Sequence, residues 1–194
     1  MFEAFSNYIT SYASTPLSAS ELELVKTAFI VKKTKRGHFL LQEGDVCKYF
    51  AFIVRGAMRQ YLVDDKGTQH MVHLGIENWW MGDRESWVMC SPSKYYIEAS
   101  EDCELLLITR DDTLRLAKQL PAFNEMVRQM DERNNIATQR RITSHISLTA
   151  EKRYLDFIDS HPDFLRRFPQ HVIASYLGVT KDTLSRLRKQ LKKA

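Results

Sequence analysis

With 194 residues, 44% hydrophobic and 27% charged, the chain has the composition of an ordinary globular protein of one large domain or two small ones. No apolar segment approaches the roughly 20 residues that cross a bilayer, and MFEAFSNYIT at the start lacks the basic and apolar regions of a secretion signal, which favours a cytoplasmic protein. Cys47, Cys90 and Cys103 have neither disulfide nor metal-site spacing, so we expect core or half-buried thiols.

The chain is expected to begin with helices and to change to short strands after residue 30. Ser18 or Ser20 can cap a helix over residues 22–29, because a serine oxygen accepts hydrogen bonds from first-turn amides. DDKG at 64–67 predicts a hairpin turn, since Asp and Gly tolerate a positive φ. The predicted strands include YFAFIV at 49–54, MRQYLV at 58–63, TQHMVHL at 68–74 and CELLLIT at 103–109. Short strands at such spacing predict a β-sandwich or β-barrel.

Two helices are predicted after the strands. Pro121 suits the start of the longer one, and no Gly or Pro interrupts the next forty residues. Its apolar stripe fades into polar residues, and one use for such a stripe is to lie on the chain's own strands. The stripe consists of Phe123, Met126, Val127, Met130 and Ala137. Thr149 can cap the next helix, in which Tyr154, Leu155, Phe157 and Ile158 would face a core.

Positive charge is concentrated at the end of the chain. Residues 181–194 contain six Lys or Arg and one Asp, a net charge of +5, and because the whole chain carries +4, the residues before them sum to −1. A basic end on a near-neutral body indicates an anionic partner, although a solvated, frayed helix end would also account for the charge alone. The helical pattern favours the partner, because leucines share one side and charged residues the other. Leu184, Leu187 and Leu191 form the first side, and Lys181, Asp182, Ser185, Arg186 and Lys189 form the second.

The residues before this helix complete a motif, PQHVIASYLGVT at 169–180. Pro169 suits the first position of a helix, Gly178 suits the left-handed backbone that ends it, and Thr180 can cap the helix that follows. Ala174 is small where two helices must approach closely. Helix, glycine turn and second helix make the layout of the helix-turn-helix. The alternative is a merely structural helical hairpin, and the agreement of several independent positions favours DNA binding.

IASYLGVTKDTLSRLRK at 173–189 resembles the helix-turn-helix of the cyclic-AMP receptor protein and FNR (Crp/Fnr) family of bacterial transcription regulators. RGHFLLQEGD at 36–45 and FAFIVRGAMRQYLVDDKG at 50–67 resemble the strands of that family's cyclic-nucleotide-binding jelly roll. The resemblance implies an α+β protein in three parts. These are a sensor jelly roll at 1–120, a connecting helix at 121–147 that pairs across a dimer, and a helix-turn-helix, winged-helix-like DNA-binding domain at 148–194.

The resemblance also assigns DNA contacts. Lys181, Asp182 and Arg186 take the positions that contact bases in the family's Arg-Glu-Thr-Val-x-Arg pattern. Arg186 can donate two hydrogen bonds to guanine and Asp182 can accept one from cytosine, whereas Lys181 lacks the rigid fork of an arginine. Thr180, Thr183, Ser185 and Lys189 are candidates for phosphate contact, and Gln170 and His171 are further candidate DNA contacts.

The same resemblance places an effector pocket around residues 79–99. Members that bind cyclic AMP carry Phe-Gly-Glu there, followed by Arg-Ser or Arg-Thr, and the Glu holds the ribose while the Arg holds the phosphate. Here Gly82 is present, Asp83 replaces the Glu and Ser93 stands at the Arg position. Lys94 is expected to face the other way, because strand side chains alternate, and Arg84 is a candidate replacement. A lost charge-assisted pair predicts that cyclic AMP does not bind tightly, and that another effector, or none, takes its place.

Metal-dependent sensing and catalysis are disfavoured. His70 and His73, with Glu77 and Asp83, faintly resemble the metal site of jelly-roll enzymes. On a strand, residues three apart point to opposite faces, so surface or core histidines are expected in place of ligands. An iron–sulfur cluster of the family's oxygen-sensing kind needs four thiolates, and this chain has three cysteines. No metal and no cofactor are therefore expected.

The sequence predicts a dimeric, sequence-specific DNA-binding transcription regulator of the Crp/Fnr type that is not an enzyme. Its expected partners are a palindromic double-stranded operator and a second copy of the chain, with RNA polymerase as a further candidate and an effector whose identity the sequence does not give. Two alternatives remain, a jelly-roll metalloenzyme with a helical appendage and a protein-interaction module.

Overall fold

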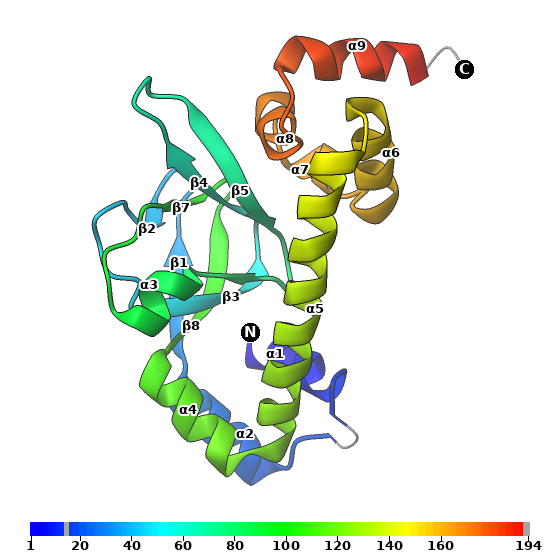
Figure 1. Ribbon diagram of the computed structural model, residues 1–194. Helices are drawn as coiled ribbons and strands as arrows, with labels where there is room; N and C mark the ends of the chain where they lie inside the picture. Colours follow the sequence, from blue (N-terminus) through cyan, green and yellow to red (C-terminus); the bar gives the residue numbers. More distant parts are fainter. Residues whose placement is uncertain (14–15, 192–194) are drawn as a thin grey trace.

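The computed structural model describes residues 1–13 and 16–191 and is drawn in Figure 1. Its described strands form two antiparallel sheets of four, ordered β1-β8-β3-β6 and β2-β7-β4-β5. The strands are β1 (Ile30–Thr34), β2 (Phe39–Leu41), β3 (Tyr49–Arg55), β4 (Met58–Val63), β5 (Gln69–Gly75), β6 (Trp80–Met81), β7 (Tyr96–Ala99) and β8 (Cys103–Thr109). Apolar residues of both sheets share one core, as the predicted jelly-roll sandwich requires.

The described helices are α1 (Phe2–Thr10), α2 (Ala19–Ala28), α3 (Arg84–Met89), α4 (Arg110–Gln119), α5 (Pro121–Ser147), α6 (Ala150–Ser160), α7 (Phe164–Arg167), α8 (Gln170–Tyr176) and α9 (Lys181–Leu191). We call strands β1–β8 with helices α1–α4 the sensor, and helices α6–α9 the reader. Helix α5 runs between them along one side of the sensor (Figure 1).

The predicted hairpin joins β4 to β5 and is confirmed. The Asp64 carboxylate accepts hydrogen bonds from the Lys66 and Thr68 amides at 2.9 and 2.8 Å, and Gly67 takes a φ of +78°. These contacts form a tight turn and set the register of the two strands. In that register Gln60 of β4 lies opposite His73 of β5, which places both beside the same side of the sheet.

A second core fixes the first half of α5 on the sensor. Phe123 and Met126 are fully buried there with Phe5 of α1 and Phe52 of β3. The expectation of a helix lying on its own strands therefore holds for this half. Beyond it, every residue from 132 to 140 is exposed. Most of the second half of α5 is thus exposed in the described chain.

The reader consists of helices in its described part, residues 150–191. The Thr149 cap is confirmed, because its hydroxyl accepts from the Lys152 amide at 3.3 Å. The winged-helix-like arrangement needs correction, since no wing strand occurs in this part of the chain. The helices alone bury enough apolar surface around Phe157 and Phe164 to form a core with the sensor. Across the described residues, no helix is long and apolar enough to span a membrane.

Candidate DNA-binding face and sensor cavity

The helix-turn-helix predicted from the sequence is present. Helix α8 is followed by Gly178, whose φ of +66° is the left-handed conformation that glycine adopts without strain. The Thr180 hydroxyl accepts a hydrogen bond of 3.1 Å from the Thr183 amide and so caps α9. Leu184 and Leu187 are buried and fix the rotation of α9 about its axis. The opposite side of α9 is therefore presented outward.

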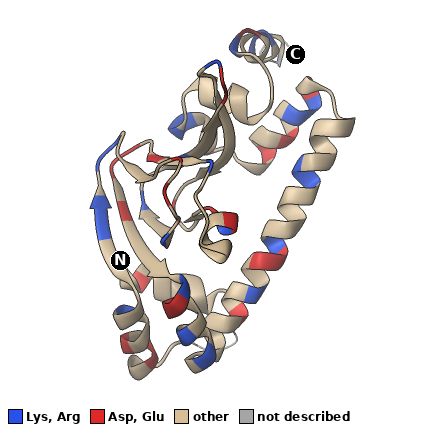
Figure 2. Ribbon diagram, turned by 60° about the vertical axis from the view of Figure 1, so that its left-hand side comes forward, with Lys and Arg blue, Asp and Glu red and all other residues tan. Residues whose placement is uncertain are grey.

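That outward side carries the residues predicted to contact DNA. Lys181, Asp182, Arg186 and Lys189 are exposed, as are Thr180, Gln170 and His171, whereas Thr183 and Ser185 are half-buried. None of the ion pairs formed within residues 1–13 and 16–191 uses a charged side chain of α9. Figure 2 shows this helix at one end of the molecule, with the ribbon at its Lys and Arg residues in blue. Its charges are thus available to a partner.

Helix α8 is bound to the sensor strand β5 through Ser175. The Ser175 hydroxyl donates to the Gln69 carbonyl and accepts from the Met71 amide, both at 3.0 Å. Strand β5 is the last strand of its sheet, so these bonds occupy edge groups that would otherwise face water. Met71 and Leu74 of β5 also pack in one core with Phe164 of the reader. The sensor therefore sets the orientation of the helix-turn-helix.

Arg167 of α7 adds an ionic clamp between reader and sensor. Its Nε and Nη2 atoms each donate to the Glu101 carboxylate at 2.7 Å, and its Nη1 donates to Glu77 at 2.9 Å. Burial alone would raise the pKa of Glu77, but hydrogen bonds from Arg167 and from the Gly56 amide lower it overall. We call Arg167, Glu77 and Glu101 the clamp.

Arg141 of α5 joins three elements. Its guanidinium donates to the carbonyls of Val72 and Met71 on β5 and to the carbonyl of Tyr176 on α8, the last at 3.3 Å. It also lies over the Tyr176 ring, 4.2 Å from the centroid, which adds a cation–π contact. One side chain thus connects the connecting helix, the sensor and the first helix of the motif.

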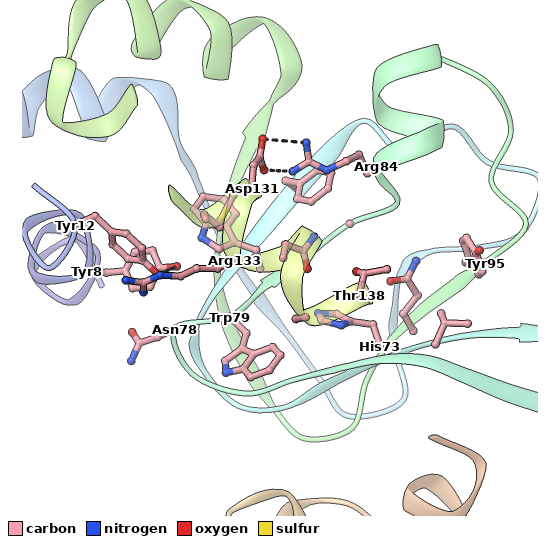
Figure 3. Close-up of a pocket in the computed structure, with 18 residues that line it drawn as sticks. Tyr8, Tyr12, His73, Asn78, Trp79, Arg84, Tyr95, Asp131, Arg133 and Thr138 are labelled. Carbon is pink, nitrogen blue, oxygen red and sulfur yellow. Dashed lines mark hydrogen bonds and ion pairs between the residues drawn. The ribbon is translucent and has the colours of Figure 1, made fainter. Parts of the chain in front are cut away.

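A cavity of about 580 Å³ lies between the sensor strands and α5 (Figure 3). Six aromatic side chains border it among other residues, and its polar groups come from both the strands and the helix. The aromatic residues are Tyr8, Tyr12, Phe50, Trp79, Trp80 and Tyr95. Val72 also borders it, one residue from the Met71 amide that Ser175 binds. A ligand in this cavity would therefore sit next to the strand that holds the reader.

The residues predicted to form the effector pocket are only partly brought together there. Gly82 and Arg84 border the cavity, whereas Asp83, Ser93 and Lys94 do not. Asp83 and Ser93 are both buried and bind each other, with 2.7 Å between the Ser93 hydroxyl and the carboxylate. Asp83 also caps α3 by accepting from the Glu85 amide at 3.1 Å. These two groups are thus occupied by the protein itself.

The two basic candidates for a phosphate anchor are also paired. Arg84 forms an ion pair with Asp131 of α5, as Figure 3 shows, and lies over the Phe50 ring. Lys94 is exposed and lies 3.7 Å from the Glu85 carboxylate. The expectation that Lys94 faces away from the pocket agrees with this position. Arg84 reaches the cavity but has its charge neutralised at the cavity wall.

Comparison with known proteins relates the strands to a protein family and most of the chain to solved structures. Residues 31–120 match the family model of the cyclic nucleotide-binding domain. FixK2 from Bradyrhizobium japonicum superposes with a TM-score of 0.71 at 19% identity, over 85% of either chain. The c-di-GMP responsive regulator CLP of Xanthomonas campestris gives 0.72 at 12% identity, over 91% of this chain and 92% of its own. Catabolite activator protein from Thermus thermophilus gives 0.54 at 20% identity, over 91% and 84%. No curated protein sequence matches significantly.

The chain has the Crp/Fnr fold. The resemblance predicted from the sequence is confirmed, and the strands at 31–120 are the cyclic nucleotide-binding jelly roll of that fold. The helix-turn-helix stands in the same order after the long helix as the sequence predicted. The division at residues 120 and 147 stays a prediction, although α5 begins and ends at Pro121 and Ser147.

Within this Crp/Fnr fold, sequence reasoning missed most of the cavity. Tyr8 comes from α1, Tyr12 from the turn after it, Gln60 from β4, and Arg133 from the exposed half of α5. These residues are far apart in the chain, and none belongs to a short motif. The one available signal was Gln60, a polar residue at an inward position of a predicted strand.

The histidines do not form a metal site. His70 is exposed and its Nε2 lies 2.8 Å from the Asp64 carboxylate, whereas His73 is half-buried beside the cavity. Burial, followed by the charge of Arg141, lowers the pKa of His73 to about 4, so its imidazole is neutral near pH 7. No cluster of metal-ligating side chains occurs among the described residues.

One expectation for the cysteines was wrong. Cys47 and Cys103 are buried thiols, as predicted, and burial raises the pKa of Cys103 to about 11. Cys90 is exposed instead, because it ends α3 with a φ of +53° and turns toward solvent.

Proposed function

We propose that the chain is a dimeric, sequence-specific DNA-binding transcription regulator of the Crp/Fnr type and not an enzyme. The observation that carries this proposal is the outward side of α9. Its backing leucines are buried in the reader, and its Lys181, Asp182, Arg186 and Lys189 are exposed without ion pairs within the described chain. Such a helix suits the major groove, where base edges are read by charged and polar side chains. A cytoplasmic location follows from this role.

The uncovered half of α5 supports pairing with a second copy. Ile142 and Ile146 are 55% and 81% exposed, and residues four apart lie on one side of a helix. Exposed aliphatic side chains on a long helix suit a partner helix of the same kind. Two-fold pairing would place two α9 helices on one face of the operator, with half-sites about 34 Å apart.

The roles within α9 can be separated by substitution. Arg186→Ala is expected to cost about 1–3 kcal/mol on the cognate site and to relax preference at one base pair, because it removes a bidentate base contact. Lys189→Ala is expected to weaken all sequences alike and to reduce the salt dependence, because it removes a phosphate contact. Binding titrations on a cognate and a scrambled operator measure both. Equal, uniform losses for the two variants would contradict this division, and DNA affinity without sequence preference would favour the protein-interaction alternative.

Cyclic AMP is expected neither to bind tightly nor to alter operator affinity. Asp83 and Ser93 satisfy each other, and Arg84 is paired with Asp131, so these positions of the predicted pocket offer no free group to a ribose and a cyclic phosphate. A ligand shifts an equilibrium only through its different affinities for the two states. Fluorescence of Trp79 and Trp80, which border the cavity, reports occupancy. A saturable change at micromolar cyclic AMP with tighter operator binding would refute this, and Arg84→Ala and Lys94→Ala would then locate the anchor.

The metalloenzyme alternative has no support in the geometry. His70 and His73 occupy different surroundings, and neither belongs to a group of three or more potential ligands within the described residues. Metal content of the purified protein, measured after dialysis, tests it directly. Stoichiometric zinc or iron would revive that alternative.

A further inference from the structure

Gln60 is a buried amide whose side chain has no hydrogen-bond partner among the described residues. It lies in the interior of β4, opposite His73 of β5 and Ile97 of β7, with 7% of its surface exposed. Its side chain makes no hydrogen bond to any residue in the described part of the chain, yet it borders the cavity. The fully buried polar side-chain atoms that lack a hydrogen-bond partner belong to other residues. The Gln60 amide is therefore not fully enclosed by protein, and it faces the cavity. A buried amide is stable only when its donor and acceptor are satisfied.

The cavity walls fit a flat ring. Trp80 and Phe50 border the cavity, and Tyr8 of α1 and Tyr12 of the turn after α1 border it as well (Figure 3). Aromatic walls favour a planar aromatic guest through stacked and edge contacts. The volume of about 580 Å³ lies within the range of small-molecule sites. His73 is opposite Gln60, and its neutral imidazole leaves the strand side of the cavity without charge.

The helix side supplies one positive charge. Arg84 and Asp131 neutralise each other. Arg133 lies 4.8 Å from the centroid of the Tyr12 ring and, within residues 1–13 and 16–191, forms no ion pair with a carboxylate. A guanidinium stacked on a ring keeps its edge free for a planar carboxylate, which it can bind through two parallel hydrogen bonds.

We propose that the cavity binds a small aromatic carboxylic acid, with its ring between the aromatic walls, a polar ring substituent on the Gln60 amide, and its carboxylate on Arg133. This inference rests on the proposed function, because it names the effector class of the sensor. It differs from a cyclic nucleotide in needing neither Asp83 nor Ser93, which the protein has closed to a ligand.

Calorimetric titration of the full chain without DNA tests the proposal. The probes are 4-hydroxybenzoate, 4-hydroxyphenylacetate and indole-3-acetate, with 4-hydroxybenzamide, cyclohexanecarboxylate and cyclic AMP as the uncharged, non-planar and nucleotide comparisons. At least one of the three aromatic acids is expected to bind saturably. The uncharged amide, the non-planar acid and cyclic AMP are each expected to bind at least about tenfold more weakly, because each lacks one charged or stacking contact.

Two variants locate the contacts. Gln60→Leu is expected to weaken the aromatic acid by about tenfold while raising the midpoint of thermal unfolding, because it removes an unpaired buried amide. Arg133→Gln is expected to weaken the acid by a similar factor, whereas Arg140→Gln, an exposed position on the same helix outside the cavity, is expected to leave it unchanged.

Absence of saturable binding by every aromatic acid up to millimolar concentration would overturn the proposal. Unchanged affinity in Gln60→Leu and Arg133→Gln would also overturn it, as would binding by cyclic AMP alone. Operator binding is measured separately on the same preparations. A chain that binds its operator but no aromatic acid refutes this inference and leaves the proposed function standing.

Discussion

Arg167→Met is expected to loosen the reader from the sensor and to lower the free energy of unfolding by about 1–3 kcal/mol. The variant keeps the apolar stem and removes the charge, so Glu77 and Glu101 face each other without the guanidinium between them. The carboxylate side chains are about one-third exposed, at 34% and 35%, and solvent screening places the loss below that of a fully buried pair. Trp79, whose ring centroid lies 5.4 Å from that of Phe164, reports the docking by its emission during urea unfolding.

The neighbouring residue provides the matched control. Arg166 is 79% exposed and, among residues 1–13 and 16–191, pairs only with Asp163 of its own turn, so Arg166→Met is expected to change stability by less than about 0.5 kcal/mol. The pKa of Glu77 is lowered in the folded protein, so the clamp contributes fully above the ordinary glutamate pKa and is lost as the pH falls through the folded value. Equal stability losses in both variants, or a wild-type clamp insensitive to acid, would contradict this role.

A chain with both Ile142→Asp and Ile146→Asp is expected to be monomeric and to lose at least about 100-fold in operator affinity. The introduced carboxylates would lie close to those of the second copy across the paired helices, and an interface between two helices of this kind requires apolar side chains. A monomer presents one α9 per encounter and loses the high effective concentration of the second. Sedimentation of the protein alone and titration of a palindromic operator measure the two effects.

Leu114→Asp serves as the comparison, because Leu114 is 48% exposed on α4 of the sensor, away from this half of α5. It is expected to leave both assembly and DNA binding unchanged. A wild-type chain that is already a monomer and binds DNA one-to-one would disprove pairing through α5. Loss of the dimer with unchanged operator affinity would show that one reader suffices.

The helix-turn-helix could be predicted from the sequence because its causes are local. A glycine in the left-handed region, a threonine cap and leucines at helical spacing each act within a few residues of chain, and the structure has all of them. The hairpin at 64–67 follows from the same kind of local turn chemistry. In contrast, the length of a strand was harder to judge, since residues 93–95 extend as a loop before β7 begins at Tyr96.

The docking of reader on sensor could not be predicted, because its contacts join residues far apart in the chain. The clamp links Arg167 to Glu77 across 90 positions, and Arg141 reaches Val72 across 69. From the sequence alone, the charge and size of these arginine side chains are compatible with many partner surfaces. Their actual partners are defined only when the sensor and the reader pack together. The effector pocket was predicted only in part, for a related reason. Asp83 was read as a ligand group, whereas its position before a short helix makes it a cap, which Ser93 then completes.

Strand β5 borders the cavity with Val72 and His73 and holds the reader through the adjacent Met71. The proposed effector and operator sites are therefore joined through one strand, and linkage requires any coupling between the two binding reactions to run in both directions. Whatever factor an effector applies to operator affinity, a bound operator must apply to effector affinity. Molecules on operators and molecules free in solution would then respond at different effector concentrations. A cell with many operators would shift the apparent sensitivity of the whole population, without any change in the cavity.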